Sequence, residues 1–166
     1  MKVPVLKIGE KVATMPIVQG GMAIRLSTAR LAASVANEGG VGLIAASGLP
    51  FDELRKEIRL ARKLSNGKGM IGINAMVAAR EFKGLITTAA QEKVDLIVAG
   101  AGFSRDMFSV GREYNVPIVP IVSYAKLAKI AERLGASAVV VEGTEAGAIW
   151  GPSVPSKISC RRSFRW

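Results

Sequence analysis

The feature that most constrains the fold of this chain is a regular alternation between short Val/Ile-rich runs and longer stretches with helical spacing. The short runs show little polar alternation, which is typical of strands in a parallel sheet that is covered on both faces. They begin at residues 16, 41, 70, 95, 117 and 137, a spacing that fits one strand, one crossover helix and two loops. The pattern predicts strands at residues 16–19, 41–46, 70–76, 95–100, 117–122 and 137–143, and helices at residues 27–38, 51–64, 81–93, 104–114 and 124–134.

Two folds can be built from six such β/α units. A doubly wound open sheet is complete at 166 residues, whereas an eight-stranded β/α barrel typically needs about 250 residues and would lack two strands here. Length alone favours the open sheet, and the periodicity leaves both folds open.

Composition excludes several classes of site. The chain has no histidine, which removes His-ligated metals and Ser-His catalytic triads. Its one cysteine, Cys160, can form neither an internal disulfide nor a metal cluster. The net charge is +10, and Lys157, Arg161, Arg162 and Arg165 contribute four of these charges after residue 151. The opening residues resemble no leader, and no uncharged run is long enough to span a bilayer. We expect a cytoplasmic protein with no membrane partner, and we do not expect nucleic acid to be a partner.

Small residues gather where the predicted strands end, in residues 19–22, 45–48, 74–76, 100–102 and 142–147. Ligands of parallel α/β proteins bind at this edge of the sheet. Glycine there lets backbone N–H groups approach a flat ring or an anion closely. Each loop taken alone is better explained as a turn, and it is their shared position at one edge that favours a ligand site. No Walker A pattern is present, and no Gly-x-Gly-x-x-Gly pattern follows the first predicted strand.

Five ordered motifs, at residues 15–23, 37–42, 72–74, 99–102 and 141–147, resemble those of the nitronate monooxygenase family, formerly called 2-nitropropane dioxygenases. They are also similar to those of its relative, the flavin-dependent enoyl-ACP reductase II. The resemblance runs from about residue 4 to residue 147 and covers the N-terminal half of such proteins. It implies an α/β fold of the (β/α)8 TIM-barrel type, truncated after about six β/α units, with FMN as cofactor.

The resemblance also implies which residues bind FMN. One set is the segment after the first strand, whose backbone would lie against the flavin ring. A second is a polar side chain that would face the pyrimidine edge, and a third belongs to the loop after the sixth strand. These cofactor-binding residues are Gly20, Gly21, Met22, Asn74, Glu142 and Gly147. Without the resemblance, the favoured interpretations are a core methionine for Met22, a turn residue for Asn74 and a solvated carboxylate for Glu142.

The chain departs from the family where the catalytic base should stand. Relatives continue as Gly-Gly-His-x-Gly, but residues 147–151 here read Gly-Ala-Ile-Trp-Gly, so Ile149 occupies the histidine position. No catalytic residue is assigned. One inserted base before a suitably written codon 148 would restore Gly-His-Leu-Gly, so we hypothesise a single-base deletion, which resequencing of the gene would test. We expect an incomplete barrel domain at residues 1–151 and a basic tail at residues 152–166 that is disordered or frame-shifted.

The family resemblance implies an FMN-dependent oxidoreductase that uses molecular oxygen to convert alkyl nitronates into a carbonyl compound and nitrite. The alternative flavin chemistry is reduction of an enoyl thioester by NAD(P)H. Because the histidine and two strands are missing, we expect this chain to be inactive. An open sheet edge would favour self-association. An alternative of another class is a non-catalytic open-sheet α/β module that binds a small anion or a protein.

Overall fold

Six parallel strands, in chain order, form the main sheet of the computed structural model, which describes residues 3–143. The strands are β3 (Val18–Gln19), β4 (Val41–Ala45), β5 (Met70–Met76), β6 (Leu96–Gly100), β7 (Ile118–Val122) and β8 (Val140–Val141). Each strand pairs in parallel with the next, so the order is β3-β4-β5-β6-β7-β8. A doubly wound sheet would instead place its first strand centrally. The barrel-type fold with six units is therefore confirmed, and the open-sheet alternative is wrong.

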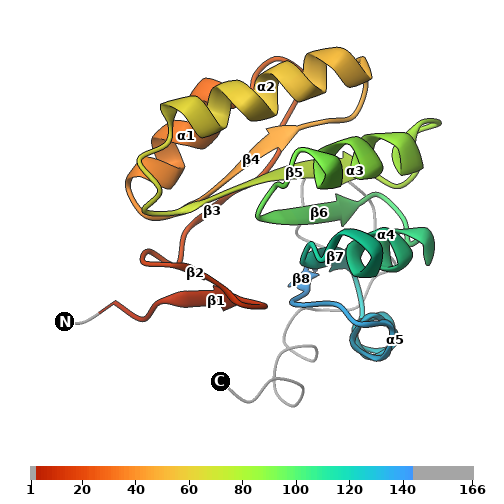
Figure 1. Cartoon of the computed structure of the whole chain (residues 1–166). Helices are drawn as coiled ribbons and strands as arrows, with labels where there is room; N and C mark the ends of the chain where they lie inside the picture. The colour runs from red at the N-terminus through yellow and green to blue at the C-terminus, as the bar shows by residue number, and fades with distance from the viewer. Residues whose placement is uncertain (1–2, 144–166) are drawn as a thin grey trace.

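Five helices connect the strands and lie along the convex side of the curved sheet (Figure 1). They are α1 (Ala29–Asn37), α2 (Phe51–Leu64), α3 (Phe82–Gln91), α4 (Asp106–Tyr114) and α5 (Ala125–Leu134). Each predicted helix is found within two residues of its expected ends. Such one-sided coverage is typical of a β/α barrel.

The sheet separates two apolar clusters, because successive strand residues point to opposite faces. On the convex face, Ile44, Ile73 and Ile97 pack with helix residues such as Leu54 and Ile58. The concave face carries the second cluster, which consists of Ile8, Ala13, Val41, Leu43, Met70, Leu96, Val98 and Val119. Both faces of the central strands are thus buried, as the continuous apolar runs indicate.

An antiparallel hairpin before β3 was not predicted. It consists of β1 (Leu6–Ile8) and β2 (Lys11–Ala13), and Leu6 pairs with Ala13. Ile8 and Ala13 are buried in the cluster on the concave face, and the hairpin lies on that side of the sheet in Figure 1. The hairpin therefore covers part of the inner face of the sheet.

A buried carboxylate ties this hairpin to the amino-terminal end of the sheet. Asp95, which immediately precedes β6, is 7% exposed and accepts hydrogen bonds from the Ile71 N–H at 2.8 Å and from Arg62 Nη1 at 2.8 Å. Its other oxygen lies 3.2 Å from Lys11 Nζ on β2. Burial raises the pKa of the Asp95 carboxyl, whereas the hydrogen bonds from Arg62 and Ile71 lower it. The lowering is the larger effect in sum, so the pKa lies below its ordinary value.

Some predictions lie outside the described residues, namely those for Gly147, Ile149, the boundary at residue 151 and the tail at residues 152–166. None of the helices in residues 3–143 has both the length and the apolar character that a membrane crossing requires.

Candidate functional site

A cavity of about 430 Å³ opens at the carboxyl ends of β3, β4 and β5. Its volume is within the range of small-molecule sites, and its position is where β/α barrels carry their active sites. The residues that line it come from the segment after β3 and from the ends of β4 and β5, and none is charged. They are Gly21, Met22, Ala23, Ile24, Ala45, Ser47, Asn74 and Met76.

Three of the residues predicted to bind a cofactor line this cavity together, namely Gly21, Met22 and Asn74. Asn74 Nδ2 donates a hydrogen bond to the Gly21 carbonyl at 3.1 Å. A Cβ atom on Gly21 would lie 2.5 Å from the Asn74 Cβ, so the close approach of the two residues requires glycine. Gly20 is not among the residues that line the cavity. Its surroundings differ from those of Gly21, since no heavy atom of residues 3–143 lies within 4 Å of the position that its Cβ would take. Among the described residues, the backbone at Gly20 is therefore open.

Apolar side chains surround the cavity and remain accessible. Met22 is 68% exposed, Ile24 50% and Met76 48%. Ser47 holds the end of β5 in place, because its Oγ accepts a hydrogen bond from the Met76 N–H at 2.8 Å. An uncharged, largely apolar surface with one amide side chain suits a flat heteroaromatic ligand.

The segment after β3 is held by two polar residues that the sequence did not single out for this role. Ser27, which is 1% exposed, accepts a hydrogen bond from the Met22 N–H at 3.0 Å. Gln19 uses its side-chain amide to bond both backbone groups of Leu43 on β4. Gln19 stands within the motif at residues 15–23, but nothing in that motif indicates a bond to Leu43. Ser27 resembles any residue that precedes a helix.

The remaining predicted residues are not brought together with this group. Glu142 directly follows β8 at the same edge of the sheet, is partly buried and donates its N–H to the Val122 carbonyl at 3.0 Å. It is not among the residues that line the cavity. Gly147 and Ile149 lie outside the described residues.

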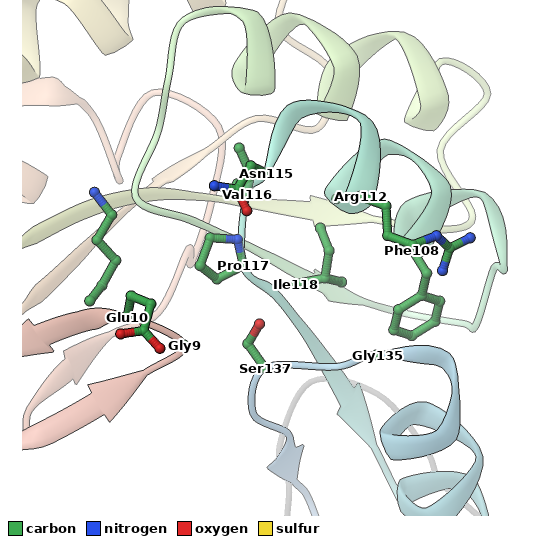
Figure 2. Close-up of a pocket in the computed structure, with 12 residues that line it drawn as sticks. Gly9, Glu10, Phe108, Arg112, Asn115, Val116, Pro117, Ile118, Gly135 and Ser137 are labelled. Carbon is green, nitrogen blue, oxygen red and sulfur yellow. The ribbon is translucent and has the colours of Figure 1, made fainter.

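A second cavity, of about 310 Å³, lies at the opposite end of the sheet (Figure 2). Gly9 and Glu10 of the hairpin turn line one side of it, while Arg112, Asn115 and Ser137 line the other. This second cavity borders the amino-terminal end of β7. The active sites of β/α barrels lie at the opposite, carboxyl ends of the strands. We therefore place the candidate site at the cavity beside Asn74. Within residues 3–143, no three His, Cys, Asp or Glu side chains are grouped so as to hold a metal ion.

Comparison with known proteins supports this choice. The model of the family described as "Nitronate monooxygenase" matches residues 7–83, a stretch that includes β3, β4, β5 and the lining residues of the cavity. Over residues 7–83, this chain is similar to the nitronate monooxygenase family. The family resemblance drawn from the motifs at residues 15–23, 37–42 and 72–74 is thereby confirmed.

Proteins of known structure share the fold of this chain. FabK from Thermotoga maritima matches with a TM-score of 0.77 and 33% identity over 83% of this chain and 43% of its own. The nitroalkane oxidase from Streptomyces ansochromogenes matches with a TM-score of 0.71 and 22% identity over 81% of this chain and 48% of its own. At that identity the second likeness supports the fold alone.

A curated relative from Rhodococcus jostii is named (3aS,4S,5R,7aS)-5-hydroxy-7a-methyl-1-oxo-octahydro-1H-indene-4-carboxyl-CoA dehydrogenase. It is 29% identical over 137 residues, which make up 82% of this chain and 38% of the relative. The chain thus spans less than half the length of each of these three relatives. Members of the nitronate monooxygenase family and the dehydrogenase alike are named as oxidoreductases.

Proposed function

We propose that the cavity beside Asn74 holds the isoalloxazine ring of FMN, in an oxidoreductase of the nitronate monooxygenase type. The observation that carries this proposal is an uncharged cavity at the carboxyl edge, in which the glycine backbone, the Met22 side chain and the Asn74 amide converge. The donor set fits a flavin, because the ring needs an apolar surface and amide-type partners for its nitrogen and oxygen edge. The phosphate group of FMN is charged and would bind outside this uncharged cavity.

Each residue has a distinct part in this proposal. The open backbone at Gly20 lets a planar ring approach closely, and the neighbouring Gly21 lines the cavity. Met22 and Met76 provide polarisable apolar surface, which also excludes water from the ring. Asn74 is oriented by its bond to the Gly21 carbonyl, and its second N–H and its Oδ1 are available to hold the polar edge. Glu142 and Gly147 stay proposed contacts from the loop after β8.

When bound, FMN would supply the redox chemistry, accepting electrons as the substrate is oxidised. The proposed substrate is an alkyl nitronate, with molecular oxygen as co-substrate and a carbonyl compound and nitrite as products. The isoleucine side chain at position 149 has no titratable group and so cannot remove a proton from a neutral nitroalkane. We propose that this chain is inactive toward neutral nitroalkanes for this reason.

A thioester is the second candidate substrate. The Rhodococcus jostii relative is named for a dehydrogenase acting on a carboxyl-CoA compound. The motif at residues 19–23 also resembles that of the enoyl-ACP reductase II branch. In this alternative, NAD(P)H is the reductant and an enoyl thioester is reduced through the same flavin site.

FMN binding by the full chain tests the site itself. We expect addition of the protein to quench FMN fluorescence, and we expect Asn74→Leu to raise the dissociation constant by about tenfold or more, because it removes the amide and keeps the branched shape of the side chain. Asn115→Leu, at a left-handed cap of α4 away from this cavity, is the matched control. Absence of quenching with wild-type protein, or equal losses in both variants, would contradict the proposal.

A second experiment separates the two chemistries on flavin-loaded protein. Mixing with a preformed nitronate and oxygen and measuring nitrite detects the first activity. Rapid bleaching of the flavin absorbance by NAD(P)H alone indicates the second. With the neutral nitroalkane in place of the nitronate we expect no nitrite, because the isoleucine at position 149 cannot remove its proton.

A further inference from the structure

Ser27 is a buried polar residue beside the candidate site for which the proposed chemistry gives no role. It is 1% exposed, and only Thr88 and Asp95 join it as buried polar or charged residues in the described part of the chain. It lies at the end of the segment that begins with Gly20 and leads into α1. Buried hydroxyl groups are nearly always hydrogen-bonded, and the partners of this one are informative.

Four hydrogen bonds connect Ser27 to its surroundings. Its Oγ accepts from the Met22 N–H at 3.0 Å and from Gln19 Nε2 at 3.4 Å. Its backbone N–H donates to the Ala23 carbonyl at 3.1 Å, and its carbonyl accepts from the Ala45 N–H at 2.9 Å. The residue therefore joins the segment after β3 to the end of β4.

The start of the same segment is fastened to β4 as well. Gln19 Oε1 accepts from the Leu43 N–H at 3.2 Å, and its Nε2 donates to the Leu43 carbonyl at 3.3 Å. That Nε2 also contacts the Gly20 carbonyl. Both ends of residues 20–27 are thus bonded to one rigid, fully buried strand.

Capping of α1 does not explain the Ser27 hydroxyl. The N-cap of α1 is Thr28, whose side chain makes no capping hydrogen bond. The Ala29 N–H is instead bonded by Glu57 Oε2 of α2 at 2.6 Å. The Ala29 N–H at the start of α1 is therefore bonded by a side chain of α2. The Ser27 hydroxyl does not cap the helix and instead bonds the Met22 N–H in the segment before it.

We propose that Ser27 is a positioning residue, whose hydroxyl fixes the Gly20–Met22 backbone in the conformation that receives the flavin ring. Met22 is 68% exposed, so packing of its side chain does not hold its backbone in place. Its N–H is nevertheless bonded to a fully buried hydroxyl. The flavin part of this inference rests on the proposed function, whereas the fixing of the backbone does not.

Amide hydrogen exchange in the cofactor-free full chain tests the fixing directly. In wild-type protein we expect the Met22 amide to exchange about tenfold or more slowly than the Ile24 amide, although both side chains are exposed. This comparison needs no variant. Equal exchange at the two amides would overturn the inference.

Ser27→Ala then removes the acceptor. We expect Met22 exchange to rise about tenfold and the FMN dissociation constant to rise by a similar factor, while exchange at Ile73 in the buried β5 stays unchanged. Ser27→Thr, which keeps the hydroxyl, should restore both values to within about threefold of wild type. Ser34→Ala is the matched control, since Ser34 is an exposed serine of α1 that bonds only the Arg30 carbonyl.

The outcomes separate the two proposals. Unchanged Met22 exchange in Ser27→Ala, or a parallel rise at Met22 and Ile73, would overturn the positioning role, because the second pattern is general destabilisation. Selective release of Met22 in a protein whose wild type binds no FMN would refute the proposed function and leave the backbone role of Ser27 standing.

Discussion

Gly20 and Gly21 are adjacent residues with opposite surroundings, and this contrast gives a test at the level of single atoms. A Cβ on Gly21 would lie 2.5 Å from the Asn74 Cβ, whereas a Cβ on Gly20 would meet no atom of the described part of the chain within 4 Å. We expect Gly21→Ala to lower the free energy of unfolding by about 1–3 kcal/mol, because Asn74 must move and its bond to the Gly21 carbonyl is lost. Urea denaturation measures the change.

The matched control is Gly20→Ala. It should leave stability unchanged or raise it by about 0.4–1 kcal/mol, since it restricts the unfolded chain without a clash. Equal destabilisation by the two alanines would mean that the close approach of Gly21 to Asn74 is not a feature of the folded protein.

Asp95 gives the chain a defined response to acid. The pKa of the Asp95 carboxyl is lower in the folded protein than in the unfolded chain. The carboxylate therefore stabilises the fold at any pH above the pKa of the unfolded chain. This contribution is lost as the pH falls through the lower pKa of the folded protein. The loss should therefore occur below pH 3.8, the ordinary value of the carboxyl. We expect Asp95→Asn to cost about 2 kcal/mol at pH 7 and to flatten the pH dependence of urea unfolding in that window.

Glu92 provides the comparison for Asp95. Its pKa is also lowered, chiefly by the hydrogen bond from Arg59, but Arg59 is 68% exposed in its side chain and the pair is screened by solvent. Glu92→Gln should change stability less than Asp95→Asn at pH 7. A larger effect of Glu92→Gln would show that the buried cluster around Asp95 does not anchor the sheet.

At the level of elements, the hairpin is the part of the fold that most needs testing, since it touches the sheet through few residues. Ile8 is 4% exposed against the concave face, and Val12 on the partner strand is 48% exposed. We expect Ile8→Ala to destabilise the protein by about 2–4 kcal/mol, because it leaves a cavity beneath the sheet. Val12→Ala should change stability by less than about 0.5 kcal/mol. Thermal unfolding of both variants would show whether the hairpin is part of the cooperative fold.

The elements also show how far the sequence determines the structure. All six parallel strands and five helices were predicted because long apolar runs of one period are strong signals. The β1–β2 hairpin was missed because each strand has three residues and buries one, which is too short for alternation to be visible. Gly21, Met22 and Asn74 were expected in one site from the family motifs, and the structure places them at one cavity. The bond between Ser27 and Met22 depends on how the loop closes, which no local pattern encodes.

On the scale of the whole molecule, the two ends of the sheet differ in the residues and elements that surround them. The amino-terminal end is fastened by Asp95 and covered by the hairpin, while the carboxyl-terminal end carries the glycine-rich segment and the apolar cavity. This division matches β/α barrels in general, where one end carries stability and the other carries function. Substitutions at Asp95 should therefore change stability, whereas those at Asn74 should change ligand binding more than stability.

The edge formed by β3 leads to a prediction for the assembly of the molecule. Within residues 3–143, β3 pairs with β4 only. Residues 15–26, which include β3, carry a group of exposed large apolar side chains. These are Met15, Ile17, Val18, Met22, Ile24 and Leu26. Open edges of this kind pair readily with another chain, and we propose that the partner is a second copy of this one.

We expect the weight-average mass in analytical ultracentrifugation to exceed 17.5 kDa and to rise with concentration. Val18→Lys should return the protein toward the monomer, because a lysine on an edge strand opposes pairing through its charge and its hydration. Leu60→Lys is the matched control, since Leu60 is an exposed leucine on α2, on the helical side of the sheet and away from the edge. If both lysines reduce the mass equally, association is a general effect of added charge. If neither does, the contact lies elsewhere, and the β3 edge is not the surface through which copies of this chain meet.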